Sequence, residues 1–384
     1  MLKMKKLMAS LMAATLLLSG ASLVKLQAEE SESKNSEASQ AEETQQGTQA
    51  QASEEDSAFN PDGLNVAMLK GPTAMGAAKL MVDQKALGTE RAFNIRLATA
   101  PDEIVPLVVK GDLDLAAVPA NLAATLYNKT KGQVEVLAIN TLGVLYIVGQ
   151  GEDVTSMADL KGKTLYASGR GATPEYVLRY LLSQNGLDPE KDLTIEWKSE
   201  HAECVAAMAQ DESAYALLPQ PFVTVAQTKN DKIKTMIDLN KAWEESNQGE
   251  HASGLVTGVL IGRKEVLEQK AEAVQEFLSA YEASMKLTEE DVDQAAELIG
   301  QVGIVPTPVA KKALPLCNIH YITGAEMKDR LSGYLKVLAE QDPKAIGGQL
   351  PADDFYYQVE TNESQVSESE ASESEVTEET KQAA

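Results

Sequence analysis

Two stretches of this chain show the same alternation of short apolar strands and amphipathic helices. Each stretch predicts three strands with a helix in each gap: 64–69, 94–98 and 113–118 in the first, and 164–167, 193–197 and 214–218 in the second. This order, found twice, predicts an α/β protein of two lobes, each with a mostly parallel sheet and flanking helices.

The two stretches align without a gap. When residues 64–121 are laid over 164–221, 11 of 58 positions are identical, and several of the identities fall at turns. The matched turn residues are Gly71 with Gly171, Thr73 with Thr173, Glu103 with Glu203, and Pro119 with Pro219. The same alignment pairs Lys70 with Arg170. We therefore expect equivalent loops in both lobes.

The helix starts follow from residue type. Thr73 and Thr173 are the expected N-caps of the first helix in each stretch, and Thr99 and Ser199 those of the second. Pro174 suits the first turn, where no amide hydrogen is needed.

Two segments are suited to crossing between the lobes and to acting as hinges. One is the apolar run at 144–148, and the other is the β-branched run at 254–261, flanked by glycines. Residues 59–145 with 258–360 then form the first lobe and 146–257 the second. Helical patterns after Arg263 are expected to pack on the first lobe.

The two ends of the chain differ in composition from the part between them. Lysines followed by a short apolar run indicate an export signal within residues 1–28. Ser19-Gly20-Ala21 resembles a lipoprotein box in which Ala21 stands where a lipid-carrying Cys would be. The sequence is therefore compatible both with a plain secreted protein and with a lipoprotein whose Cys has been lost or replaced. Segments 29–58 and 361–384 lack the apolar residues of a core and predict a disordered acidic linker and tail.

Charge and residue chemistry exclude several functions. The net charge of −24 argues against nucleic acid or an anionic membrane surface as a partner. None of the three histidines has a metal-ligand partner at short spacing, and no nucleophile or phosphate-loop motif is present, so we expect neither catalysis nor a metal or cofactor. His201 is expected to be a solvated first-turn residue, and Cys204 and Cys317 to be free buried thiols.

Parallel sheets bind ligands beyond the carboxyl ends of their strands, where helix N-termini point. Lys70 and Arg170 lie at such ends and suggest a phosphate or sulfonate ligand, although both could instead face solvent. Four aromatic residues could stack on a flat ring: Tyr146, Tyr166, Tyr176 and Phe222.

Four segments of the chain resemble the solute-binding proteins of ABC importers, in the nitrate, sulfonate, taurine and thiamine-precursor group. They are GPTAMGAAKLM, KGDLDLAAVPANLAATLYNK, LPQPFVTVA and TGVLIGRKEVL. The resemblance covers residues 60–357. It implies a two-lobed type II periplasmic-binding fold that closes on a small molecule and delivers it to a membrane permease with its ATPase. It also implies a monomer that associates with the membrane only through an anchor or the permease. In Gram-positive bacteria such proteins are normally lipid-anchored at the cell surface.

The resemblance also implies a set of ligand contacts. They are Lys70, Gly71, Thr73, Ala74, Met75, Asn121, Asn140, Thr141, Ser168, Arg170, Gly171, Ala172, Thr173, Gln220 and Pro221. Many relatives have Glu at the position of Gln220, so recognition of an amino group there is in doubt. The expected function is capture of a sulfonate- or nitrate-like anion, or of a heteroaromatic thiamine precursor. An enzyme on the same fold, of the chorismate- or pyrimidine-processing type, and a surface sensor are the alternatives.

Overall fold

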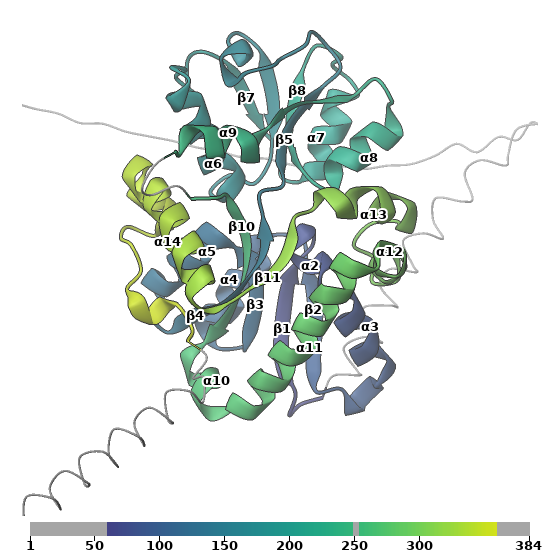
Figure 1. Cartoon of the computed structure of the whole chain (residues 1–384), viewed down its shortest axis with the longest axis vertical. Helices are drawn as coiled ribbons and strands as arrows, with labels where there is room; N and C mark the ends of the chain where they lie inside the picture. Colours follow the sequence, from purple (N-terminus) through teal and green to yellow (C-terminus); the bar gives the residue numbers. More distant parts are fainter. Residues whose placement is uncertain (1–59, 249–252, 359–384) are drawn as a thin grey trace, which may run out of the picture. The chain divides into compact units, whose positions relative to one another are not determined.

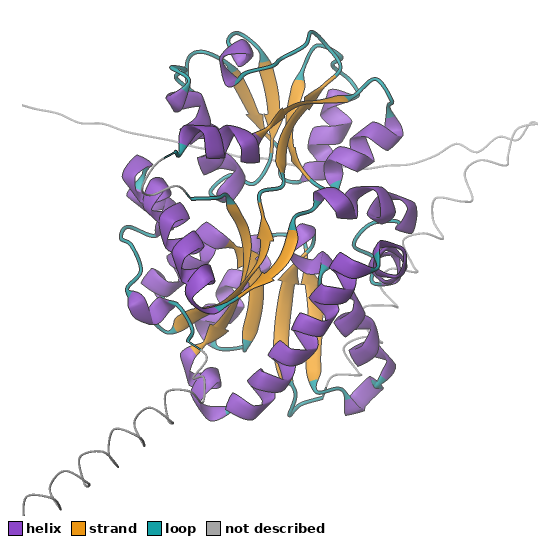
Figure 2. Ribbon diagram, in the orientation of Figure 1, coloured by secondary structure: helices purple, strands orange, loops and turns teal. Residues whose placement is uncertain are grey.

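The computed structural model describes residues 60–248 and 253–358. The predicted export signal, acidic linker and acidic tail lie outside these residues, and so does His251. Figure 1 and Figure 2 show two β-sheets, each flanked by helices. We call the parts built on them the first and the second lobe.

The first lobe has the strand order β11-β4-β10-β3-β1-β2. Its strands are β1 (Leu64–Leu69), β2 (Phe93–Ala98), β3 (Leu115–Pro119), β4 (Val134–Leu142), β10 (Val256–Arg263) and β11 (Ile319–Ile322). Strands β2, β1 and β3 run parallel, whereas β10 is antiparallel to both β3 and β4.

The second lobe repeats this plan in the order β7-β6-β8-β5-β9. Its strands are β5 (Leu145–Gly149), β6 (Thr164–Ala167), β7 (Thr194–Trp197), β8 (Tyr215–Pro219) and β9 (Lys234–Asp238). The parallel triplet β7-β6-β8 matches β2-β1-β3, so the predicted duplication and two-lobed fold are confirmed.

Both sheets are mixed because of the crossing strands. The chain enters each lobe at the carboxyl ends of the parallel triplet, and the entering strand, β5 or β10, therefore runs against its neighbour β8 or β3. The chain passes between the sheets at the start of the predicted crossing 144–148: β4 ends at Leu142 in the first sheet, and β5 begins at Leu145 in the second. The residues of the predicted second crossing from Val256 onward belong to β10. The lobe boundaries given above stay predictions.

Helices cover both faces of each sheet (Figure 2). In the first lobe they are α2 (Pro72–Met75), α3 (Ala78–Ala86), α4 (Pro101–Lys110), α5 (Ala120–Lys129), α10 (Lys264–Gln269), α11 (Ala271–Glu290), α12 (Val292–Gln301), α13 (Thr307–Ala313) and α14 (Gly324–Gln341). In the second lobe they are α6 (Thr173–Gln184), α7 (His201–Met208), α8 (Phe222–Lys229) and α9 (Leu239–Ser246). Short 3-10 turns lie at Gly88–Glu90, Met157–Leu160, Leu314–Leu316, Pro343–Ile346 and Asp353–Phe355.

The helices after Arg263 pack on the first lobe, as their pattern predicts. Helix α11 crosses one face of the first sheet (Figure 1) and buries Phe277, Tyr281 and Met285 in the core shared with β1. On the other side, α14 carries Tyr334, whose ring lies 5.3 Å from that of Trp243 on α9 of the second lobe. This contact joins the cores of the two lobes.

The predicted N-caps are wrong by one or more residues. Helix α6 begins at Thr173 itself with Ala172 as its N-cap, and α2 has Gly71 as its N-cap. The second helices have Ala100 and Glu200 as N-caps rather than Thr99 and Ser199. At these second helices a glutamate supplies the acceptor instead: Glu103 accepts from the Thr99 amide at 3.1 Å, and its duplicate Glu203 from the Ser199 amide at 2.9 Å.

Cys204 and Cys317 are both buried and unpaired, as expected. Within the described ranges, no helix is both long and apolar enough to span a bilayer.

Candidate functional site

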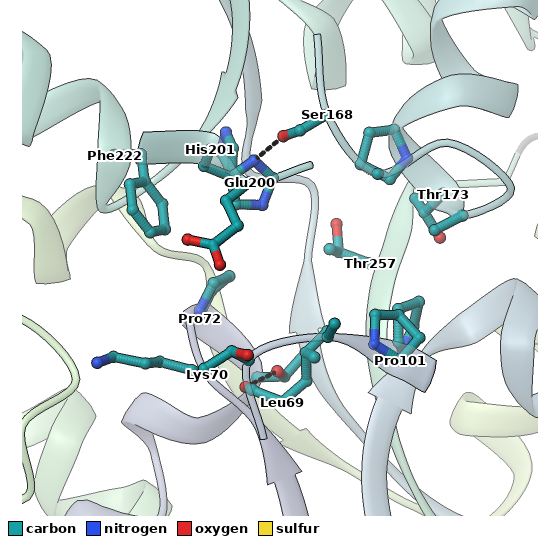
Figure 3. A pocket seen from close by; sticks show the side chains of 18 of the residues that line it. Leu69, Lys70, Pro72, Pro101, Ser168, Thr173, Glu200, His201, Phe222 and Thr257 are labelled. Atoms are coloured by element: carbon teal, nitrogen blue, oxygen red, sulfur yellow. Dashed lines mark hydrogen bonds between the residues drawn. The ribbon is translucent and has the colours of Figure 1, made fainter. Parts of the chain in front are cut away.

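A cavity of about 350 Å³ lies between the two lobes, at the carboxyl ends of both parallel triplets (Figure 3). The first lobe contributes Leu69, Lys70, Pro72, Thr73, Thr99, Ala100, Pro101, Pro119, Thr257 and Ile304. The second lobe contributes Leu145, Ser168, Gly169, Ala172, Thr173, Pro174, Ser199, Glu200, His201, Ala202, Pro219 and Phe222. Apolar side chains form just over half of this lining, and polar or charged side chains form most of the rest.

Four helices of eight or more residues begin at this cavity. Their first residues all line it: Pro101 of α4, Thr173 of α6, His201 of α7 and Phe222 of α8. The positive ends of four helix dipoles therefore lie at one volume, which favours a negatively charged group there.

His201 and Ser168 form a short polar contact in the cavity wall. Ser168 Oγ lies 2.5 Å from His201 Nδ1, and the imidazole also packs on Phe222 with ring centroids 4.9 Å apart. Desolvation by burial lowers the pKa of His201 to about 4, so the ring is neutral at pH 7. The second ring nitrogen faces the cavity (Figure 3), and in the tautomer in which Ser168 donates to Nδ1 it carries the proton.

The environment expected for His201 is therefore wrong. The residue does open α7, as the sequence predicts, but it is partly buried in the cavity wall rather than solvated. The reason is tertiary: the neighbouring turn at Ser168 and the start of α8 at Phe222 close around it.

Five of the predicted contacts line the cavity: Lys70, Thr73, Ser168, Ala172 and Thr173. Gly71, Arg170 and Gly171 lie on the same two loops but do not line it. Arg170 is exposed, so of the two cations considered only Lys70 lines the cavity, and its ammonium group extends away from Thr257 and Thr173 (Figure 3). Of the four candidate stacking residues, only Phe222 does so.

The other predicted contacts are buried behind the cavity wall, namely Ala74, Met75, Asn140, Thr141, Gln220 and Pro221. Two of their side-chain oxygens accept hydrogen bonds within the fold, whereas Asn140 Nδ2 is buried without a hydrogen-bond partner among the described residues. Gln220 Oε1 accepts from Thr224 Oγ1 at 2.9 Å, and Asn140 Oδ1 accepts from Thr141 Oγ1 at 3.0 Å. A direct ligand contact from any of them stays a prediction.

Asn121 does not line the cavity but is buried at the contact between the lobes. It is 1% exposed and joins the lobes: its amide donates to the carbonyl oxygens of Gly171 at 3.3 Å and Ala345 at 3.1 Å.

Sequence reasoning missed the turn at the end of the second strand in each lobe. Residues 99–101 and 199–202 both line the cavity, and the gap-free alignment pairs 99–101 with 199–201. The duplication therefore contained the signal. Thr257 on β10 was also missed, because the hydrophobic pattern there indicates only a strand.

Two α/β lobes that enclose a cavity at the carboxyl ends of their strands define a binding protein of the periplasmic type. The chain belongs to the family described as "ABC transporter, phosphonate, periplasmic substrate-binding protein", whose model matches residues 81–309. It is thus a solute-binding component of an ABC importer, and a small-molecule ligand, export from the cytoplasm and a permease with its ATPase follow from that family.

Solved structures share the fold. An ABC transporter protein of Parabacteroides distasonis is 23% identical over 77% of this chain and 99% of its own, with a TM-score of 0.64. The alkanesulfonate-binding protein SsuA of Xanthomonas axonopodis pv. citri, bound to MOPS, is 16% identical over 77% of this chain and 96% of its own, with a TM-score of 0.59. The nitrate-binding protein NrtA of Synechocystis PCC 6803 is 14% identical over 65% of this chain and 68% of its own, with a TM-score of 0.51. No match was found among curated proteins.

Within residues 60–248 and 253–358, no cluster of three or more His, Cys, Asp or Glu side chains is arranged to hold a metal ion.

Proposed function

We propose that the cavity between the lobes binds a small organic oxyanion of the phosphonate, sulfonate or nitrate type and presents it to the importer. The observation that carries this proposal is the convergence of α4, α6, α7 and α8 on one cavity, together with the neutral His201 ring, one nitrogen of which faces it (Figure 3). Backbone amides and a neutral ring N–H bind an oxyanion by hydrogen bonds and helix dipoles, without a formal counter-charge.

The rest of the cavity suits an organic body. Leu69, Pro101, Leu145, Ile304 and Phe222 provide apolar surface around the polar groups. Glu200 also lines the cavity, and its carboxylate would repel an anion, so the charged head belongs on the side of Thr173 and Pro101, away from Glu200 (Figure 3). A heteroaromatic thiamine precursor is supported less, because His201 and Phe222 supply both aromatic rings of the wall and pack against each other.

Binding is testable by thermal shift and calorimetry on protein freed of ligand by unfolding and refolding. Ethylphosphonate, ethanesulfonate and nitrate are the oxyanion probes; ethanol is the uncharged control, and a hydroxymethylpyrimidine represents the alternative. A ligand present at a hundred times its Kd stabilises the fold by about 2.7 kcal/mol. We expect a shift with at least one oxyanion and none with ethanol. Binding of the pyrimidine alone would refute the oxyanion proposal.

We infer further that the protein acts as a monomeric, non-catalytic receptor at the outer face of a Gram-positive membrane. The family supports this role, and the Leu18-Ser19-Gly20 sequence supports a lipoprotein ancestry in which Ala21 replaces the acylated Cys. Recovery of each probe chemically unchanged after prolonged incubation tests the absence of catalysis, and fractionation of producing cells tests whether the chain is anchored or released.

A further inference from the structure

Thr257 lies on β10 where this strand pairs irregularly with β4. Val256 pairs with Leu142 and Gly258 with Thr141, so two steps along β10 oppose one step along β4. This is the geometry of a β-bulge with Thr257 as the extra residue. Bulges turn a side chain out of the regular alternation, and here the side chain belongs to the cavity wall.

The hydroxyl of Thr257 is buried without a hydrogen-bond partner. The residue is 9% exposed, and its Oγ1 has no partner among the described residues. Figure 3 shows the oxygen directed into the space between His201 and Thr173. A buried hydroxyl without a partner is unfavourable, so it marks a place where a hydrogen-bonding group is missing.

The other buried hydroxyls of the cavity wall are already engaged. Thr73 Oγ1 donates to the Leu69 carbonyl oxygen at 2.8 Å, and Thr173 Oγ1 donates to Asn121 Oδ1 at 3.2 Å. Ser168 Oγ is held by His201. An oxyanion accepts hydrogen bonds and donates none, so it needs a hydroxyl whose proton is uncommitted, and Thr257 supplies it.

We propose that Thr257 is a ligand-binding residue that donates a hydrogen bond from the first lobe to an oxygen of the ligand. The inference rests on the proposed oxyanion function and adds a residue to it. Because His201 donates from the second lobe, the ligand oxygens would be held from both lobes. Binding would therefore favour the approach of the two lobes.

The test compares Thr257→Val, which keeps the shape but removes the hydroxyl, with Thr257→Ser, which keeps the hydroxyl. Thr288→Val is the matched control, because Thr288 is a buried threonine of the same lobe whose hydroxyl bonds Ser284 O at 3.0 Å on α11, outside the cavity wall. Calorimetry uses ethylphosphonate, ethanesulfonate and nitrate, and thermal unfolding uses the ligand-free proteins.

We expect Thr257→Val to weaken the best-bound probe about tenfold or more, and Thr257→Ser to stay within about threefold of wild type. The ligand-free Thr257→Val protein should unfold at the wild-type temperature or above, since no bond is lost. Equal affinity of wild type and Thr257→Val, or a clear loss of thermal stability in ligand-free Thr257→Val, would overturn the role of Thr257. A wild-type protein that binds none of the three probes refutes the oxyanion proposal itself, and this inference with it.

Discussion

Thr173 of the second lobe donates a hydrogen bond from its hydroxyl to the side-chain oxygen of Asn121 in the first lobe, at 3.2 Å. Both residues are buried, with Asn121 1% and Thr173 0% exposed. The amide of Asn121 also donates to Gly171 O on the same loop. Each lobe therefore meets the other through a helix start beside the cavity, and these hydrogen bonds join the lobes there.

Replacing Thr173 by Val should weaken ligand binding. The substitution leaves Asn121 Oδ1 buried without its donor, which costs about 1–3 kcal/mol in the closed form. That cost corresponds to about a 5- to 150-fold loss of affinity for the best-bound oxyanion probe. Calorimetry measures it, and Thr228→Val, whose hydroxyl bonds Thr224 O on α8, is the control. Unchanged affinity in Thr173→Val would show that this bond does not favour closure.

The place of Thr173 at a strand-to-helix turn could be predicted from the sequence, but its hydrogen bond to Asn121 could not. The gap-free duplication places Gly71 with Gly171 and Thr73 with Thr173, and the fold confirms that both pairs lie at equivalent strand-to-helix turns. Local sequence could not give the partners of the hydroxyls. Thr173 bonds a residue 52 positions away, and Thr73 bonds the carbonyl of its own strand end, although both have the sequence features of an N-cap.

The cavity wall was harder to predict for the same reason. His201, Glu200 and Phe222 come from two different helix starts, and only the packing of α7 beside α8 brings them together. Thr257 depends on a bulge, which arises from pairing between distant strands and leaves no mark in the alternation of apolar residues.

Neutral His201 should make stability depend on pH. Its folded pKa, about 4, lies below the unfolded value of about 6.5, so the unfolded state binds more protons between these two values. The contribution is complete above pH 6.5 and is lost as the pH falls toward 4, on the order of 2 kcal/mol after allowance for partial exposure. Urea unfolding at several pH values, compared between wild type and His201→Gln, measures this contribution.

The control for the pH experiment is His320→Gln, since the His320 side chain is 46% exposed, lies outside the cavity wall and is 3.0 Å from Glu289. We expect only His201→Gln to flatten the pH profile between 4 and 6.5. Parallel profiles for wild type and His201→Gln would mean that the imidazole is as well solvated in the folded protein as in the unfolded chain.

The two thiols should be unreactive in the folded protein. Burial raises the pKa of Cys204 to about 11 and also raises that of Cys317, and both side chains are 0% exposed. The thiolate is the reactive form, so Ellman's reagent at pH 8 should label neither thiol in native protein and both after unfolding in guanidinium. Rapid labelling in native protein would contradict the burial, and Cys204→Ala and Cys317→Ala would show which thiol reacted.

The aromatic contact between α9 and α14 should stabilise the joint between the lobes. Trp243 is fully buried, donates from Nε1 to Ser253 O at 2.8 Å, and packs on Tyr180 and Tyr334. Truncation by Tyr334→Ala should lower the unfolding free energy by about 3–5 kcal/mol, as for other large aromatic residues removed from a core. The same change admits water to the indole, so its emission should shift to longer wavelength. Trp197→Phe leaves Trp243 as the single tryptophan and serves as the parent protein for both measurements. A Tyr334→Ala variant of this parent with unchanged emission and stability would show that the two lobes do not depend on this contact.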